Sequence, residues 1–125
     1  MEKTTKIGNA LLVNKTQYLN YHVIEIDNTL IDYYFRFVYI NLPVISKETV
    51  MEHIQNKTIL PELLLAIYSV TYMFKPNPDI EKSRKYNKMA LYFLTNHEHK
   101  LDVQIVQAYA IISRCSNYIY IYIYI

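Results

Sequence analysis

The densest group of candidate metal ligands in this 125-residue chain is His97-Glu98-His99. In a helix the two histidines would lie on different faces, and no further ligand set at zinc-site spacing accompanies them. His22 and His53 stand alone in the sequence. The pattern therefore favours histidines in an exposed loop over a metal centre, and we expect no metal ligand in this chain.

Cys115 is the single cysteine, which excludes a disulfide within the chain and a cysteine-rich zinc site. A catalytic thiol needs a neighbouring base, and its pKa falls when it opens a helix. Cys115 has no adjacent base in the sequence and follows a predicted helix. We expect a small buried residue at this position rather than a nucleophile.

The clustered charges also have a simple structural interpretation. Glu48 and Glu52 are spaced i, i+4 within a polar stretch, which is typical of a solvated helix face. The basic residues Lys82, Arg84, Lys85 and Lys88 could contact phosphates, but Asp79 and Glu81 dilute their charge. The sequence thus predicts no catalytic residue and no cofactor-binding residue, and we expect a protein that is not an enzyme.

The composition is that of one domain or part of one, with 52% hydrophobic and 19% charged residues. The net charge of +2 is too small to indicate a nucleic-acid surface by itself. Gly8 is the single glycine, which excludes a glycine-rich phosphate loop. The longest apolar run, residues 59–74, contains Glu62 and falls short of the roughly 20 residues of a membrane span. We therefore expect no membrane segment.

Helical periodicity and helix caps predict five helices from Asp27 onward. The first follows Asp27-Asn28-Thr29 and ends before Pro43, because the residue before proline avoids the α region. The second is capped by Ser46 and covers residues 47–55. The third begins at Pro61, runs to residue 74 and is apolar almost all round, which predicts a central position.

Two further helices follow the loop of residues 75–79. Asp79 is expected to cap the fourth helix, whose apolar stripe contains Tyr86, Met89, Ala90, Phe93 and Leu94. Asp102 is expected to cap the fifth, with Leu101 and Val106 as a hydrophobic staple and Ile105, Ala108, Tyr109 and Ile112 as its stripe. Short connections between amphipathic helices predict an all-α packed array of about five helices.

The two ends of the chain have different patterns. Residues 1–26 are predicted to be an irregular or extended lead-in to a helical domain of residues 27–116, and residues 21–27 alternate loosely enough to be a strand or an extended segment. Residues 117–125 form a low-complexity Tyr-Ile tail, which a TA-rich repeat read in frame would encode. An edge strand is the alternative, because Tyr and Ile alternate at period two. We expect the tail from Tyr118 to pack poorly.

The order of several short motifs resembles the fungal-specific transcription factor domain, the middle homology region of fungal zinc binuclear cluster regulators. The opening Leu-Ile-x-x-Tyr-Phe motif and the Pro-Ile motif are matched here by Leu30, Ile31, Tyr34, Phe35, Pro43 and Ile45. The leucine-rich helix and the last two helices are matched by Leu63, Leu64, Leu65, Ile67, Ala90, Leu101, Val106, Gln107 and Ala108. The resemblance covers residues 27–114.

This resemblance implies an N-terminal fragment of a regulatory domain that acts in the nucleus. In the family, zinc and DNA contact belong to a cysteine-rich module that is not found in this sequence. We therefore expect no cofactor in this chain, no specific DNA binding by it, and partners that are proteins or the rest of a larger regulator. The alternative is a generic helical interaction scaffold unrelated to transcription.

Overall fold

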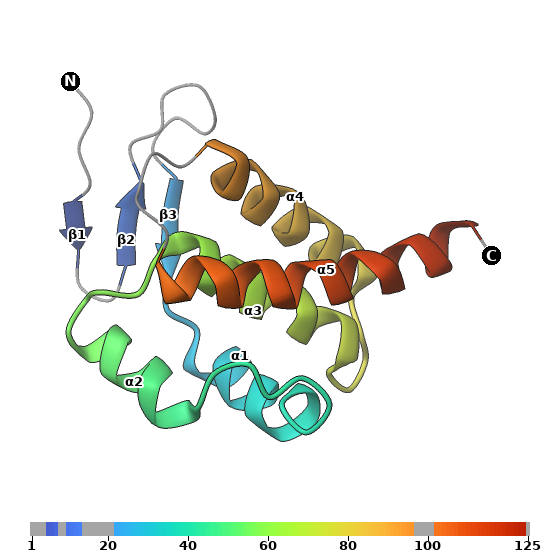
Figure 1. Ribbon diagram of the computed structural model, residues 1–125, viewed down its shortest axis with the longest axis horizontal. Coiled ribbons are helices and arrows are strands. Elements are labelled where there is room, and N and C mark those ends of the chain that lie inside the picture. The colour runs from blue at the N-terminus through green and yellow to red at the C-terminus, as the bar shows by residue number, and fades with distance from the viewer. Residues whose placement is uncertain (1–4, 8–9, 14–21, 97–101, 125) are drawn as a thin grey trace.

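A computed structural model of the chain describes residues 5–7, 10–13, 22–96 and 102–124 (Figure 1). The helices are α1 (Asn28–Tyr33), η1 (Tyr34–Val38), α2 (Lys47–Gln55), α3 (Pro61–Phe74), α4 (Ile80–Asn96) and α5 (Val103–Tyr124). The strands are β1 (Thr5–Ile7), β2 (Ala10–Val13) and β3 (His22–Glu25). The predicted all-α class is confirmed, because the helices form the body of the molecule and the strands are short.

Helix α3 is the centre of the array. It packs against α4 and α5 and also against α1 and η1, and its residues from Glu62 to Thr71 are all buried. Leu64 and Ile67 are fully buried, as the apolar pattern around the whole helix predicted. Helices α1, η1, α4 and α5 pack against α3, and the buried residues form one core that extends from Ile24 in β3 to Cys115 in α5.

The helix starts follow the predicted caps. The carboxylate of Asp27 accepts a hydrogen bond from the Leu30 N–H at 3.0 Å, and the Ser46 hydroxyl accepts one from the Thr49 N–H at 3.1 Å. Asp79 and Asp102 do the same for α4 and α5, with the amides of Lys82 and Gln104 as donors. Each cap satisfies an amide that has no partner within its helix.

The first predicted helix is divided in two. After six α-helical residues the chain widens into the π-helical turn η1, in which the Tyr39 N–H donates to the Tyr34 carbonyl at 2.9 Å. Tyr34 begins this turn, and its ring is buried in the core, where its hydroxyl donates to the Leu42 carbonyl at 2.9 Å. Helical periodicity does not predict such a turn, because the turn inserts one residue without changing the composition of the helix.

The N-terminal region contains a three-stranded sheet, and its strand β3 lies within residues 21–27, for which a strand was one of two interpretations. Strands β1, β2 and β3 pair antiparallel in that order, with Leu12 opposite Val23 across the second pair. Ile24 of β3 is buried and belongs to the core. The lead-in is therefore extended, as expected, but β3 is also a packed element.

The C-terminal repeat continues α5 and does not form a strand, so the edge-strand alternative is wrong. The Tyr118 ring meets the Phe74 ring edge-on at 4.8 Å, and Ile119 packs against the core. Poor packing was therefore a wrong prediction for these two residues. Beyond them, Tyr120 is 62% exposed, and the last turns of α5 extend past α3 and α4 (Figure 1).

Candidate functional site

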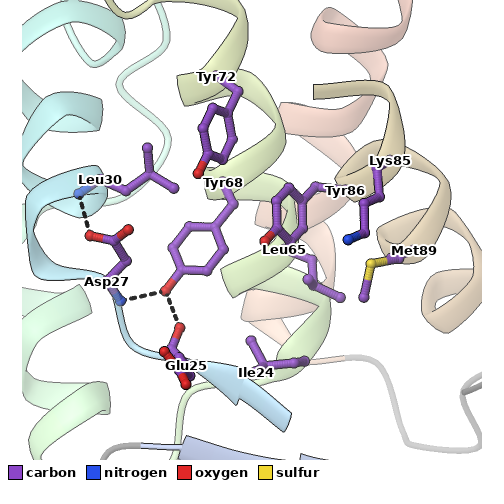
Figure 2. Close-up of a pocket in the computed structure, with 10 residues that line it drawn as sticks. All are labelled: Ile24, Glu25, Asp27, Leu30, Leu65, Tyr68, Tyr72, Lys85, Tyr86 and Met89. Atoms are coloured by element: carbon purple, nitrogen blue, oxygen red, sulfur yellow. Dashed lines mark hydrogen bonds between the residues drawn. The ribbon is translucent and has the colours of Figure 1, made fainter. Parts of the chain in front are cut away.

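A cavity of about 280 Å³ lies where β3 and the start of α1 meet α3 and α4 (Figure 2). We call it the tyrosine pocket, because Tyr68 and Tyr72 of α3 and Tyr86 of α4 form its walls. The remaining lining residues come from all four elements and are Ile24, Glu25, Asp27, Leu30, Leu65, Lys85 and Met89. The spacing i, i+4 places Tyr68 and Tyr72 on one face of α3.

Tyr68 connects the pocket to the backbone that precedes α1. Its hydroxyl donates to the Glu25 carbonyl at 2.6 Å and accepts from the Asp27 N–H at 2.8 Å (Figure 2). Burial of the ring raises the pKa of Tyr68 above its ordinary value, so the hydroxyl stays protonated at neutral pH. The two bonds fix the end of β3 and the N-cap of α1 on the central helix.

Tyr72 and Tyr86 are parallel, with ring centroids 5.7 Å apart, and lysines lie over their faces. The Lys82 ammonium is 5.4 Å from the centroid of Tyr72, and the Lys85 ammonium is 5.8 Å from that of Tyr86. Cations in this position are attracted by the negative face of the ring. Burial is the main cause that raises the pKa of both tyrosines.

The chemistry available in the tyrosine pocket is that of binding. The protonated tyrosine hydroxyls, the Lys85 ammonium and the Glu25 carboxylate can hold a small polar molecule by hydrogen bonds. Covalent catalysis requires a nucleophile held by a general base, whereas the side-chain hydrogen bonds of Tyr68 and Asp27 in this lining go to backbone groups. Its volume is also just below the range of about 300–1,000 Å³ that is typical of small-molecule sites.

Cys115 lies in a second buried cluster, between α3, α4 and α5. Its thiol contacts the Ser69 hydroxyl at 3.2 Å and the Ser83 hydroxyl at 3.6 Å, and it is completely buried, as predicted. Burial raises the pKa of the Cys115 thiol, although hydrogen bonds from the neighbouring polar groups oppose this effect. A protonated, inaccessible thiol is not a nucleophile, so this cluster is a packing contact among three helices.

Most of the motif residues lie in the core, although they do not converge on one site. The fully or nearly fully buried ones are Leu30, Ile31, Tyr34, Ile45, Leu63, Leu64, Leu65, Ile67, Ala90 and Ala108. Phe35 and Gln107 are half-buried and Pro43 is exposed. Of the expected staple, Val106 is 51% exposed and Leu101 lies outside the described residues.

The remaining candidate residues from the sequence do not form a site among the described residues. His97, Glu98 and His99 lie outside the described residues. His53 bonds through Nδ1 to the Thr58 hydroxyl at 2.8 Å, while Glu48 and Glu52 are exposed. The stripe of the fifth helix predicts a buried Tyr109, which is wrong, because Tyr109 is 45% exposed. Ile111 of the same helix is completely buried. Within the part of the chain that the structure describes, no three His, Cys, Asp or Glu side chains are grouped to hold a metal ion.

The tyrosine pocket was missed by sequence reasoning. The periodicity of the fourth helix places Tyr86 in its apolar stripe, and only the packing of distant segments brings it together with Tyr68, Glu25 and Asp27. The available signal was the i, i+4 pair Tyr68 and Tyr72 on a helix that is otherwise apolar. Among the helices described, none is long and apolar enough to cross a membrane.

Comparison with known proteins assigns this helical array to a family. The model of the fungal specific transcription factor domain matches residues 31–120, from α1 to the exposed end of α5. The match covers most of the chain, which therefore belongs to this family, and the resemblance drawn from the motifs is confirmed. The family is one of transcription factor domains and not of enzymes. No curated protein and no solved structure matches the chain.

Proposed function

We propose that this chain is a non-enzymatic regulatory part of a fungal transcription factor of the zinc-cluster type. In this proposal another module of the regulator supplies the zinc site and the contact with DNA, and the protein acts in the nucleus. The observation that carries the proposal is the family match over the whole helical array.

The packing of the array supports a role in transmitting a signal rather than in chemistry. Helix α3 contacts α1, η1, α4 and α5, so in this proposal it is the element through which a change at one of them would reach the others. Gln104 extends this connection, because its side chain accepts from the Leu60 N–H at 2.8 Å and donates to the Thr58 carbonyl at 3.1 Å. It thereby joins the start of α5 to the segment before α3.

A tethered reporter assay tests the proposal. The full chain is fused to an unrelated DNA-binding domain and expressed in yeast with a reporter that carries the matching sites. A regulatory domain should change reporter expression at least severalfold, and Ile67→Asp should remove the effect by placing a charge in the core. Ile40→Asp is the matched control, because Ile40 is 81% exposed and should tolerate the charge.

The generic scaffold is the competing hypothesis, and the same assay separates the two. A scaffold unrelated to transcription should leave the reporter unchanged while the fusion is expressed and folded. A second test concerns the zinc-cluster context. We expect the genomic DNA upstream of the first codon to contain, in frame, a repeated Cys-x-x-Cys array. Its absence over several hundred codons would favour the scaffold.

A further inference from the structure

A second hollow, of about 340 Å³, lies where η1, the end of α3 and the second half of α5 meet. We call it the Arg114 groove, and its lining includes Phe37, Asn41, Leu42, Phe74, Arg114 and Tyr118. It shares no lining residue with the tyrosine pocket. The groove is therefore a separate candidate site.

The charge of the groove is positive and uncompensated. Arg114 is the single charged residue of α5, and the lining of the groove contains no carboxylate. Within the described segments, no carboxylate forms an ion pair with Arg114, and the side-chain amide of Asn41 makes no hydrogen bond, whereas its backbone N–H donates to the Val38 carbonyl at 3.0 Å. Both polar side chains are thus available to an acceptor from outside the chain.

The walls of the groove are aromatic and partly open to solvent. Phe37 and Phe74 are each 37% exposed, and the Phe74 ring meets the Tyr118 ring edge-on at 4.8 Å. The Arg36 guanidinium lies 5.4 Å from the centroid of the Phe37 ring, which adds a second cation beside the groove. Exposed aromatic surface beside the guanidinium groups of Arg36 and Arg114 suits a ligand that is apolar at one end and anionic at the other.

The π-helical turn contributes to this shape. Phe37 lies in η1 and Asn41 in the segment that follows, so the backbone irregularity occurs in the wall of the groove itself. Single π-helical turns occur frequently at functional sites, because the inserted residue changes the direction of the side chains around it. The Tyr34 hydroxyl anchors the same segment through the Leu42 carbonyl.

We propose that the Arg114 groove binds a small organic acid. The Arg114 guanidinium pairs with the carboxylate, the Asn41 amide donates to the same group, and the apolar body covers Phe37, Phe74 and Tyr118. A planar guanidinium matches a carboxylate with two parallel hydrogen bonds, which explains why arginine suits this position better than lysine. This inference goes beyond the proposed function and does not depend on it.

The experiment is a titration of the full chain, labelled with ¹⁵N, with phenylacetate and hexanoate. Amide shifts report where each acid binds, and calorimetry gives the dissociation constant. The neutral probes 2-phenylethanol and hexan-1-ol have the same apolar bodies without the carboxylate. We expect both acids to shift the amides around Asn41, Phe74 and Arg114, and to bind about tenfold or more tightly than the alcohols, because a hydrogen bond to a charged group is strong.

Two variants with the same charge change complete the design. Arg114→Gln should weaken acid binding about tenfold or more and leave alcohol binding unchanged. Arg84→Gln is the control, since Arg84 is exposed on α4 and lies outside the groove. Equal binding of acids and alcohols, or equal loss in both variants, would overturn the proposal. Binding of an acidic peptide to the groove without binding of either acid would also overturn it, in favour of a protein partner.

Discussion

Ser69 and Ser83 hold α3 against α4 by exchanging two hydrogen bonds. The Ser69 hydroxyl donates to the Ser83 carbonyl at 2.9 Å, and the Ser83 hydroxyl donates to the Ser69 carbonyl at 2.7 Å. Both side chains are completely buried and both contact the Cys115 thiol of α5. Two small residues thereby let the helices approach closely and satisfy their polar groups at the same time.

The first prediction follows from this exchange. Ser69→Ala and Ser83→Ala should each lower the free energy of unfolding by about 0.5–1.5 kcal/mol, the net contribution of a typical hydrogen bond. The double variant should lose less than the sum, since each hydroxyl belongs to the same network. Urea unfolding followed by circular dichroism measures the effect. Ser113→Ala is the control, because its exposed hydroxyl bonds only within α5, to the Ala110 carbonyl.

The second prediction concerns the central helix. Ile67→Ala should cost about 2–5 kcal/mol of unfolding free energy, because it leaves a cavity in a fully packed core. Ile67→Val should cost about 0.5–1.5 kcal/mol by the same reasoning. Ile40→Ala serves as the surface control and should change stability by less than about 0.5 kcal/mol. An Ile67→Ala variant as stable as the control would contradict the central position of α3.

The third prediction concerns the dependence of stability on pH. The raised pKa of Tyr68 means that the folded chain keeps this proton after the unfolded chain has lost it, near pH 10. Unfolding then releases a proton, so the contribution of Tyr68 to the unfolding free energy is fully present below about pH 10 and falls as the pH rises further. Burial also raises the pKa of Tyr34, Tyr72 and Tyr86, so these tyrosines add to the slope.

Tyr68→Phe tests this assignment. It should reduce, but not abolish, the decline of unfolding free energy above about pH 10, because Tyr34, Tyr72 and Tyr86 still contribute. At neutral pH the variant should also lose about 1–3 kcal/mol, since the Glu25 carbonyl and the Asp27 N–H lose their partner. Unfolding curves at neutral and alkaline pH measure both effects. A slope equal to that of the unmodified chain would show that the hydroxyl titrates normally.

The fourth prediction separates the two parts of the Tyr-Ile tail. Deleting residues 120–125 should change the midpoint of thermal unfolding by about 2 °C or less, because Tyr120 and Ile121 are exposed. Deleting residues 118–125 should lower it further, because the contacts of Tyr118 with Phe74 and of Ile119 with the core are lost. Equal midpoints for the two truncations would show that the contacts of Tyr118 and Ile119 add no stability.

The helices were predictable where local signals agree. The bounds of α2 and α3 follow from Ser46 and Pro61 at their starts and from the prolines that follow α3, and the structure has the same bounds. The central position of α3 followed from its apolar residues on every side. These features depend on residues close in sequence, so helix caps and hydrophobic periodicity are enough to predict them.

The remaining features depend on contacts between distant segments. The strand β3 has four residues, too few for a distinct alternation, and its pairing with β2 depends on the whole sheet. The repeat from Tyr118 alternates like a strand, yet with no partner strand it continues α5 and packs Tyr118 on Phe74. The tyrosine pocket and the Arg114 groove each combine residues from three or more elements, so neither could be predicted from local spacing.

The central claim is that this helical array is regulatory and does not itself read DNA. Specific reading requires side chains held at base edges by an element docked in a groove of the duplex. The exposed basic residues of α4 lie beside Glu81, and the chain carries a net charge of +2. Non-specific affinity depends on the number of phosphates neutralised, so we expect it to be weak and sensitive to salt.

Fluorescence anisotropy with labelled random and GC-rich duplexes, at low and physiological salt, tests this claim most directly. The account predicts weak binding at low salt that is equal for both duplexes, falls when Lys85→Gln and Lys88→Gln are combined, and disappears at physiological salt. Binding that persists at physiological salt and prefers one duplex would contradict it.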